Sequence, residues 1–146
     1  MDRRISASVS APPARTIDTL SDLGTYPEWL SLVTGADPVD DETWMVTLRA
    51  RLGPLARSKR LRMTRTHLDA TRVRFERNEV DGREHAEWIL EAAVAPAEDS
   101  ETSHARSEVV VHLHYSGSLW SGPLEIALSA FEGSAAERLD AYLSRS

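Results

Sequence analysis

The sequence predicts an α+β fold, in which an antiparallel sheet is followed by a C-terminal helix. Short segments of alternating polar and apolar residues recur up to residue 117, as is typical of strands with one buried face. Turn-forming pairs such as Asp81-Gly82 separate them. After residue 120 the apolar residues recur at steps of three or four, which indicates a helix. The 146 residues suffice for one domain spanning 1–146 with a substantial core.

The first strand is expected over residues 4–11, where Ile5, Ala7 and Val9 alternate with polar residues. Pro12-Pro13 ends it, and two short helices are expected next. These helices cover residues 14–23 and 26–30, and further strands cover 44–52, 55–67, 71–80, 84–94 and 108–117. We therefore expect six to seven strands, with a polar exposed loop over 96–106.

One long helix is expected at the C-terminus, with Gly133 allowing a bend. Its apolar stripe consists of Leu124, Leu128, Phe131, Ala135, Leu139 and Tyr142. The sheet must bury one face against this helix. One helix cannot fill a strongly curved sheet, and the two short helices would close the remaining end. The predicted architecture therefore encloses an internal cavity.

Composition and charge exclude several classes of protein. Apolar residues make up 41% and charged residues 27%, which argues against disorder. The net charge is −6, so we expect no nucleic-acid partner. A basic run from Arg49 to Arg65 could still bind phosphate or RNA, but it lacks interleaved aromatic residues. The alternative is that it forms solvated strand faces paired with acidic residues.

The chain contains no cysteine, which excludes disulfides, thiolate catalysis and cysteine-based metal sites. The N-terminus lacks the apolar segment of a signal peptide. The longest stretch without Asp, Glu, Lys or Arg, residues 109–124, is too short and polar to span a bilayer. We expect a cytoplasmic protein without stable membrane insertion and without a cofactor.

Several features, taken in order, resemble one known superfamily. They are Ala11-Pro12 after the first strand, the segment Leu20-Ser21-Asp22-Leu23, Tyr26-Pro27-Glu28-Trp29, the strand with Phe75-Glu76-Arg77, Asp81-Gly82-Arg83 followed by Trp88, and the C-terminal helix. Together they are similar to the START/Bet v1-like superfamily, and within it to the bacterial polyketide cyclase/dehydrase and lipid-transport group. The resemblance implies a helix-grip fold around an apolar cavity. It supplies no catalytic motif.

Three polar residues share strand faces with apolar ones, and we expect them to point inward. Arg65 and His67 are expected on the same strand face as Leu61 and Met63, and Arg77 on the same face as Phe75, because residues two apart in a strand share a face. Buried arginines are rare unless they are paired. The functional interpretation is that Arg65, His67 and Arg77 orient a polar end of a ligand. The alternative is that they lie near strand ends, pair with Glu79 or Glu87, and contact water.

Aromatic residues complete the candidate ligand site. Phe75, Trp88 and Tyr115 fall on the expected inner faces of their strands, and Tyr26 and Trp29 lie at the expected cavity mouth. Aromatic side chains line pockets, but they also fill ordinary cores.

His112 and His114 have the spacing at which two imidazoles share one strand face and could bind one metal ion. That face is opposite the apolar one and is expected to be exposed. His85 and Glu87 would add ligands only if their strand is adjacent. We therefore predict no metal site.

These observations predict that the protein binds a small hydrophobic ligand such as a lipid, isoprenoid or polyketide. Transport of such a ligand is one form that this function could take. The first alternative is a polyketide cyclase or dehydratase that uses acid–base chemistry, with His67 assisted by Arg65 or Tyr115. The second is a module that binds a protein partner. A monomer and a homodimer are both compatible with the sequence.

Overall fold

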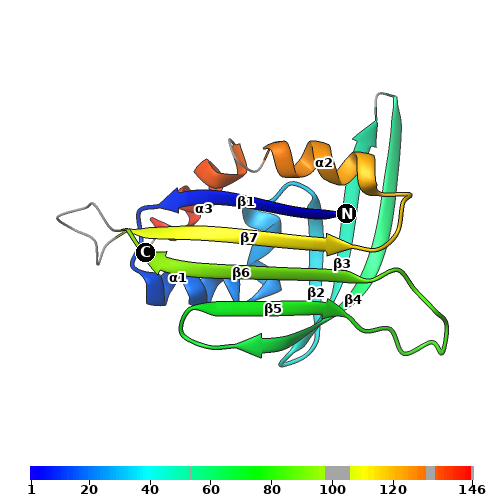
Figure 1. The fold of residues 1–146 in the computed structure, drawn as a ribbon, viewed down its shortest axis with the longest axis horizontal. Helices are drawn as coiled ribbons and strands as arrows, with labels where there is room; N and C mark the ends of the chain where they lie inside the picture. Colours follow the sequence, from blue (N-terminus) through cyan, green and yellow to red (C-terminus); the bar gives the residue numbers. More distant parts are fainter. Residues whose placement is uncertain (53, 98–105, 131–133, 146) are drawn as a thin grey trace.

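Seven antiparallel strands form one curved sheet in the computed structural model, which describes residues 1–52, 54–97, 106–130 and 134–145. The strands are β1 (Asp2–Val9), β2 (Val33–Asp40), β3 (Thr43–Leu52), β4 (Leu55–Leu68), β5 (Arg72–Arg77), β6 (Trp88–Pro96) and β7 (Ser107–Tyr115). Their order across the sheet is β1-β7-β6-β5-β4-β3-β2. In Figure 1, β1, β7, β6 and β5 run side by side, and β3 and β4 turn across them. The predicted fold class is thus confirmed.

The helices lie against the concave side of the sheet. They are α1 (Pro13–Leu20), the 3-10 helix η1 (Leu23–Glu28), α2 (Ser121–Ala130) and α3 (Ala136–Leu143). Helix α1 packs on β6, α3 packs on β1, and α2 packs mainly on β3. In Figure 1 the two C-terminal helices follow one another along the edge of the sheet that carries β1.

The buried residues follow the alternation expected from the sequence. In β7, Val109, Val111, Leu113 and Tyr115 are buried, whereas the residues between them are at least partly accessible. The inner faces of β1, β4, β5 and β6 show the same pattern. Removing these side chains from water drives the sheet and the helices together.

Three parts of the sequence prediction compare with the structure in different ways: the C-terminal helix, the loop over 96–106 and residues 33–40. The expected C-terminal helix is present as α2 and α3, on the two sides of residues 131–133, and Phe131 and Gly133 therefore lie outside the described residues. Most of the expected loop over 96–106 is also outside them. Strand β2 was not expected, because its sequence contains Gly35 and Pro38; an edge strand tolerates proline because one side of it needs no partner.

The expected strands on both sides of Asp81-Gly82 are shorter than predicted. Strand β5 ends at Arg77 and β6 begins at Trp88, so residues 78–87 form a loop. The turn itself is confirmed, since Gly82 has a φ of 72°, a conformation that favours glycine.

Candidate ligand cavity

A cavity of about 80 Å³ lies between the sheet and the helices. Every described residue that lines it is apolar or aromatic, and none of their nitrogen or oxygen atoms faces the open space. The lining residues are Ile5, Leu23, Tyr26, Trp29, Leu30, Leu32, Val33, Val46, Leu48, Leu61, Met63, Trp88, Leu90, Val111, Leu113 and Leu124. The sheet side of the cavity is formed by β1, β3, β4, β6 and β7, and the other side by η1, the segment after it, Val33 at the start of β2, and α2.

The strand register explains why these side chains meet. Val46 pairs with Leu61 across β3 and β4, and Leu90 pairs with Leu113 across β6 and β7. Alternate residues of a strand share a face, so each pair presents two apolar side chains to the concave side. The sequence analysis did not assign residues 30–33 to the site, although the run Trp29-Leu30-Ser31-Leu32-Val33 is largely apolar.

Tyr26 and Trp29 form part of the wall, and both are buried rather than at an open mouth. Their ring centroids are 4.6 Å apart. The Tyr26 hydroxyl donates to the carbonyl oxygen of Leu20 at 2.9 Å, which fixes the ring. Burial raises the pKa of the Tyr26 hydroxyl well above its ordinary value, and the nearby Asp22 charge adds to this. The phenol therefore stays neutral and cannot serve as a base at physiological pH.

Trp88 also lines the cavity, from the first position of β6. Its ring lies 4.6 Å from that of Tyr115 and 6.3 Å from that of Trp120. Among the described residues, its indole N–H is buried without a hydrogen-bond partner. Because none of the polar atoms of the lining faces the open space, Trp88 contributes apolar surface to the cavity and no available polar group.

Phe75 and Tyr115 are buried but do not line the cavity. Phe75 packs edge-on against Trp44, at a centroid distance of 5.7 Å. The Tyr115 hydroxyl accepts a hydrogen bond from the Trp120 backbone N–H at 3.2 Å. Both residues therefore belong to the packed core around the cavity and do not form its surface.

Arg65 lies at the edge of the inner face and points away from the cavity. Its guanidinium donates to the carbonyl oxygen of Ser21 at 2.7 Å. It also stands 5.6 Å from the centre of the Trp44 ring, in a cation–π arrangement. Arg65 therefore joins β4 to the end of α1 and borders an open hollow with Asp22 and Tyr142.

The inward orientation expected for His67 is wrong. A β-bulge between Arg65 and His67 inserts one residue into β4, so Arg65 pairs with the buried Phe75 but His67 pairs with Arg74. The extra residue reverses the alternation and moves His67 to the outer face. Its Nε2 atom lies 2.7 Å from Asp69, in solvent.

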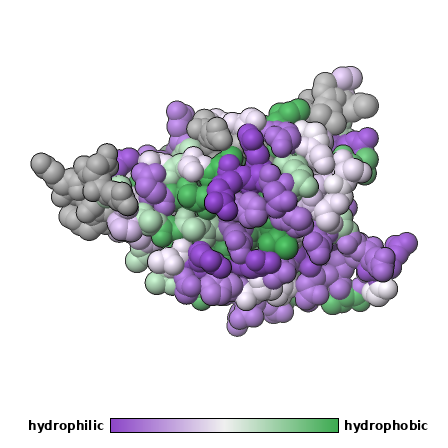
Figure 2. Space-filling view, in the orientation of Figure 1, coloured by the Kyte–Doolittle hydropathy of each residue, from purple (hydrophilic) through white to green (hydrophobic). Residues whose placement is uncertain are grey.

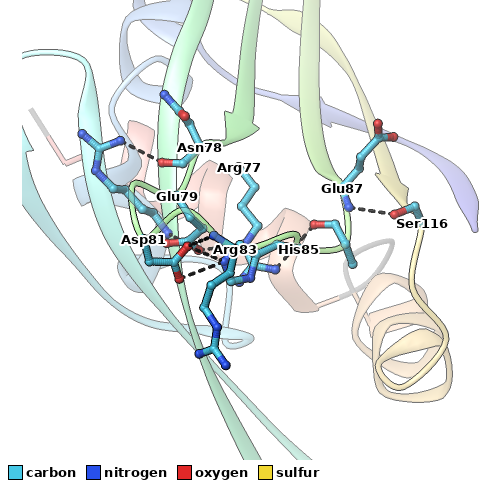
Figure 3. A network of polar contacts seen from close by, with 10 residues as sticks. Arg77, Asn78, Glu79, Asp81, Arg83, His85, Glu87 and Ser116 are labelled. Carbon is cyan, nitrogen blue, oxygen red and sulfur yellow. Dashed lines mark hydrogen bonds and ion pairs between the residues drawn. The ribbon is translucent and has the colours of Figure 1, made fainter.

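Arg77 does face inward, as expected, but it is enclosed by residues 78–87 and does not reach the cavity. Its Nε atom donates to Glu79 at 2.7 Å, so the pairing weighed as the alternative is present. Figure 3 shows Arg77 and Glu79 within a network of the 78–87 loop, where His85 binds Asp81 and the Glu87 N–H donates to Ser116. This network holds the loop against the end of the sheet.

His112 and His114 lie on the outer face, as expected, and each contacts Asp2 on the neighbouring strand β1. His114 also lies 3.1 Å from Glu87. Within the described residues, no three histidine or acidic side chains are arranged to hold a metal ion. These histidines instead join the ends of β1, β6 and β7.

Three exposed arginines of the basic run lack, among the described residues, the acidic partners that the alternative supposed. Arg49, Arg57 and Arg60 are exposed, and none of them has an acidic partner in the part of the chain that the structure describes. Arg62 donates to the carbonyl oxygen of Asn78 at 2.8 Å.

The arrangement can hold an apolar molecule, and its described lining supplies no acid, base or nucleophile. Pockets for drug-sized ligands measure roughly 300–1,000 Å³. At about 80 Å³ the cavity accepts only a small molecule or part of a larger one. No helix among the described residues is long and apolar enough to cross a membrane.

The curved sheet, the helices on its concave side and the apolar cavity define a START/Bet v1-like helix-grip protein. Solved structures show the same fold. A START superfamily protein from Mycobacterium smegmatis has a TM-score of 0.71 at 10% identity, with 99% of this chain and 97% of that chain covered. A protein from Thermus thermophilus has a TM-score of 0.67 at 18% identity, with coverages of 98% and 97%.

A third similar structure is the di-domain ARO/CYC BexL from the BE-7585A biosynthetic pathway, with a TM-score of 0.61 at 17% identity. The match covers 97% of this chain and 45% of that one, so this chain corresponds to about half of the di-domain protein. No curated protein shows significant similarity in sequence. The model of the family "Polyketide cyclase / dehydrase and lipid transport" matches residues 3–143. The chain belongs to this family, as its sequence resemblance indicated.

Proposed function

We propose that the protein binds the hydrocarbon portion of a small hydrophobic ligand in its cavity. The observation that carries the proposal is that every described residue of the lining presents apolar surface to the cavity. A bound carbonyl or hydroxyl would lose its hydrogen bonds to water and gain none from the described wall, which is costly. An acyl chain or an isoprenoid therefore suits the cavity better than the oxygen-rich part of a polyketide. Transport of such a ligand is compatible with this proposal.

The same lining argues against acid–base catalysis within the cavity. His67, the base considered from the sequence, lies on the opposite face of the sheet, and the Arg65 guanidinium is engaged by Ser21. Tyr26 is the only titratable residue among the described lining residues, and burial raises its pKa. General acid–base catalysis needs a group whose pKa lies near the working pH. Binding is thus favoured over a cyclase or dehydratase activity.

The first test uses two ligands of nearly equal shape, ethylbenzene and acetophenone, which differ by a carbonyl oxygen. NMR titration gives their relative affinities. We expect the dissociation constant in water to be about tenfold lower for ethylbenzene, because the carbonyl oxygen of acetophenone loses its hydrogen bonds to water and an unpartnered buried acceptor costs about 1–3 kcal/mol. Equal dissociation constants for the two compounds, or binding of neither compound, would contradict the proposal.

A variant pair locates the binding. Leu124→Phe places a larger side chain into the cavity from α2, whereas Ile126→Phe changes an exposed residue of the same helix. We expect Leu124→Phe to abolish ethylbenzene binding and Ile126→Phe to preserve it, with circular dichroism confirming that both variants fold. Native mass spectrometry of the gently purified protein, with solvent extraction, then identifies any apolar molecule bound at a one-to-one ratio.

A further inference from the structure

One part of the sheet extends beyond its neighbours as a two-stranded ribbon. Residues 49–52 of β3 and 55–60 of β4 continue past the last pairs with β2 and β5, which are at Leu48 and Met63. In Figure 1 this hairpin projects beyond the rest of the sheet. We call these residues the basic ribbon.

The basic ribbon carries a charge opposite to that of the remaining chain. It contains Arg49, Arg51, Arg57, Lys59 and Arg60, and there is no acidic residue from Thr43 to Leu68. The rest of the chain therefore holds 12 basic and 23 acidic residues, a formal charge of −11. Arg49, Arg57 and Arg60 are exposed and have no acidic partner among the described residues. Unpaired arginines with such separation of charge form an anion-binding surface.

The cations lie on both faces of the ribbon. Arg57 and Lys59 are opposite Ala50 and Leu48, on the face that continues the cavity wall. Arg60 pairs with Thr47, on the other face. A flat acidic protein surface would reach only one of these faces. An occupant that surrounds the ribbon, such as a layer of lipid headgroups or a nucleic-acid groove, reaches both.

Nearby apolar residues favour the lipid layer. Leu119, just before α2, is 64% exposed, and Ile126 of α2 is 60% exposed. Helix α2 packs on β3, the strand that runs into the ribbon. Figure 2 shows apolar surface over α2 next to the hairpin. Aliphatic side chains beside cations suit a bilayer interface, whereas single-stranded nucleic acid is bound on aromatic side chains.

We propose that the basic ribbon, together with Leu119 and Ile126, docks the protein on an anionic lipid surface. The negative charge of the remaining chain repels duplex nucleic acid strongly, because the duplex carries one negative charge per about 1.7 Å of its length. It repels a membrane less, because the anionic lipids there are scattered among neutral ones. Leu48 and Leu61 border the ribbon and line the cavity, so docking holds the cavity beside the bilayer. Docking of this kind does not depend on which ligand the cavity holds.

The test is flotation of the full chain with phosphatidylcholine vesicles that do or do not contain phosphatidylglycerol. The ribbon variant is Arg49→Gln/Arg57→Gln/Arg60→Gln. The matched control is Arg4→Gln/Arg72→Gln/Arg83→Gln, which removes the same charge from exposed arginines outside the ribbon. Circular dichroism confirms that both variants fold.

We expect the wild type to float only with the anionic vesicles. Each Arg near such a surface contributes about a fivefold gain, so the ribbon variant should bind on the order of a hundredfold more weakly. The control variant should retain most of the binding, and added salt should weaken it. The proposal is overturned by a wild type that does not float, by equal losses in the two variants, or by ribbon-dependent binding to duplex RNA or polyglutamate in place of vesicles.

Discussion

The Nε atom of Arg77 donates to a carboxylate oxygen of Glu79 at 2.7 Å, and the two side chains are only 8% and 15% exposed. Glu79 also accepts from the backbone N–H of Arg62 at 3.3 Å. The pair therefore joins β4, the end of β5 and the following loop (Figure 3). An arginine that the sequence suggested for ligand binding is thus part of the protein's own structure.

Removal of one member of this pair should destabilise the fold. Arg77→Ala leaves the Glu79 carboxylate buried without its partner, and breaking a buried pair costs about 3–5 kcal/mol. We expect the free energy of unfolding in urea to fall by about 3 kcal/mol, at the lower end of that range. The matched control is Arg74→Ala, because the Arg74–Glu91 pair is more exposed and should cost about 1 kcal/mol or less. A similar small loss for both variants would show that Arg77 is not held as described.

Enlarging the cavity should change ligand size preference. Leu124→Ala removes a fully buried side chain from the cavity wall. We expect a loss of about 2–5 kcal/mol in unfolding free energy and tighter binding of the fluorescent probe N-phenyl-1-naphthylamine per folded molecule. Leu139→Ala is the control, since Leu139 in α3 is equally buried but does not line the cavity. It should destabilise the protein without improving probe binding, and improved binding in both variants would count against the assigned cavity.

Gly117 should not tolerate even a methyl group. A Cβ atom built there would overlap the Tyr115 hydroxyl, which is held by the Trp120 N–H. Because Tyr115 and Trp120 are buried, we expect Gly117→Ala to lower the unfolding free energy by about 1–3 kcal/mol. Gly122 is the matched control, since a Cβ there meets no atom within 4 Å. Thermal unfolding of Gly122→Ala should show an unchanged or raised Tm, and equal Tm values for both variants would refute the packing argument.

Asp69 gives a pH-dependent contribution to stability. Its carboxylate accepts from the backbone N–H groups of Thr71 and Arg72, both at 2.8 Å, and contacts His67 at 2.7 Å. These hydrogen bonds hold the pKa of Asp69 well below its ordinary value of 3.8, and the bond from the Thr71 backbone N–H has the largest effect. Because the pKa of Asp69 is lower in the folded protein than in the unfolded chain, the ionised carboxylate stabilises the folded protein at pH values above its ordinary pKa. This stabilisation is lost as the pH falls through the lowered pKa of the folded protein.

We therefore expect Asp69→Asn to lower the Tm at neutral pH, with the difference from the wild type shrinking as the pH falls below about 4. Thermal unfolding at a series of pH values measures this difference. Asp37→Asn, on the exposed edge strand β2, controls for the change in net charge. A difference for Asp69→Asn that stays constant with pH would mean that the charge of Asp69 does not contribute.

The fold class and most of the core can be predicted from the sequence alone. Alternation in β7 identified Val109, Val111, Leu113 and Tyr115 as buried, because a strand with one face in the core keeps most of that face apolar. The turn at Gly82 was predictable, because few other residues adopt its φ. These features depend on local geometry, which the order of residues encodes directly. The same local rules also identified Tyr26, Trp29 and Trp88, which line the cavity.

The positions of the polar residues relative to the cavity depend on contacts that form only in the tertiary structure. One inserted residue in β4 places His67 on the outer face, and the local sequence Arg65-Thr66-His67 does not predict that bulge. The partners of Arg65 and Arg77 come from the end of α1 and from the 78–87 loop, which only the assembled sheet brings close. Likewise, Arg49, Arg57 and Arg60 have no acidic partner among the described residues, because β3 and β4 extend past the last pairs with β2 and β5. Such contacts depend on strand register and strand length, which are set by pairing between distant segments rather than by any one of them.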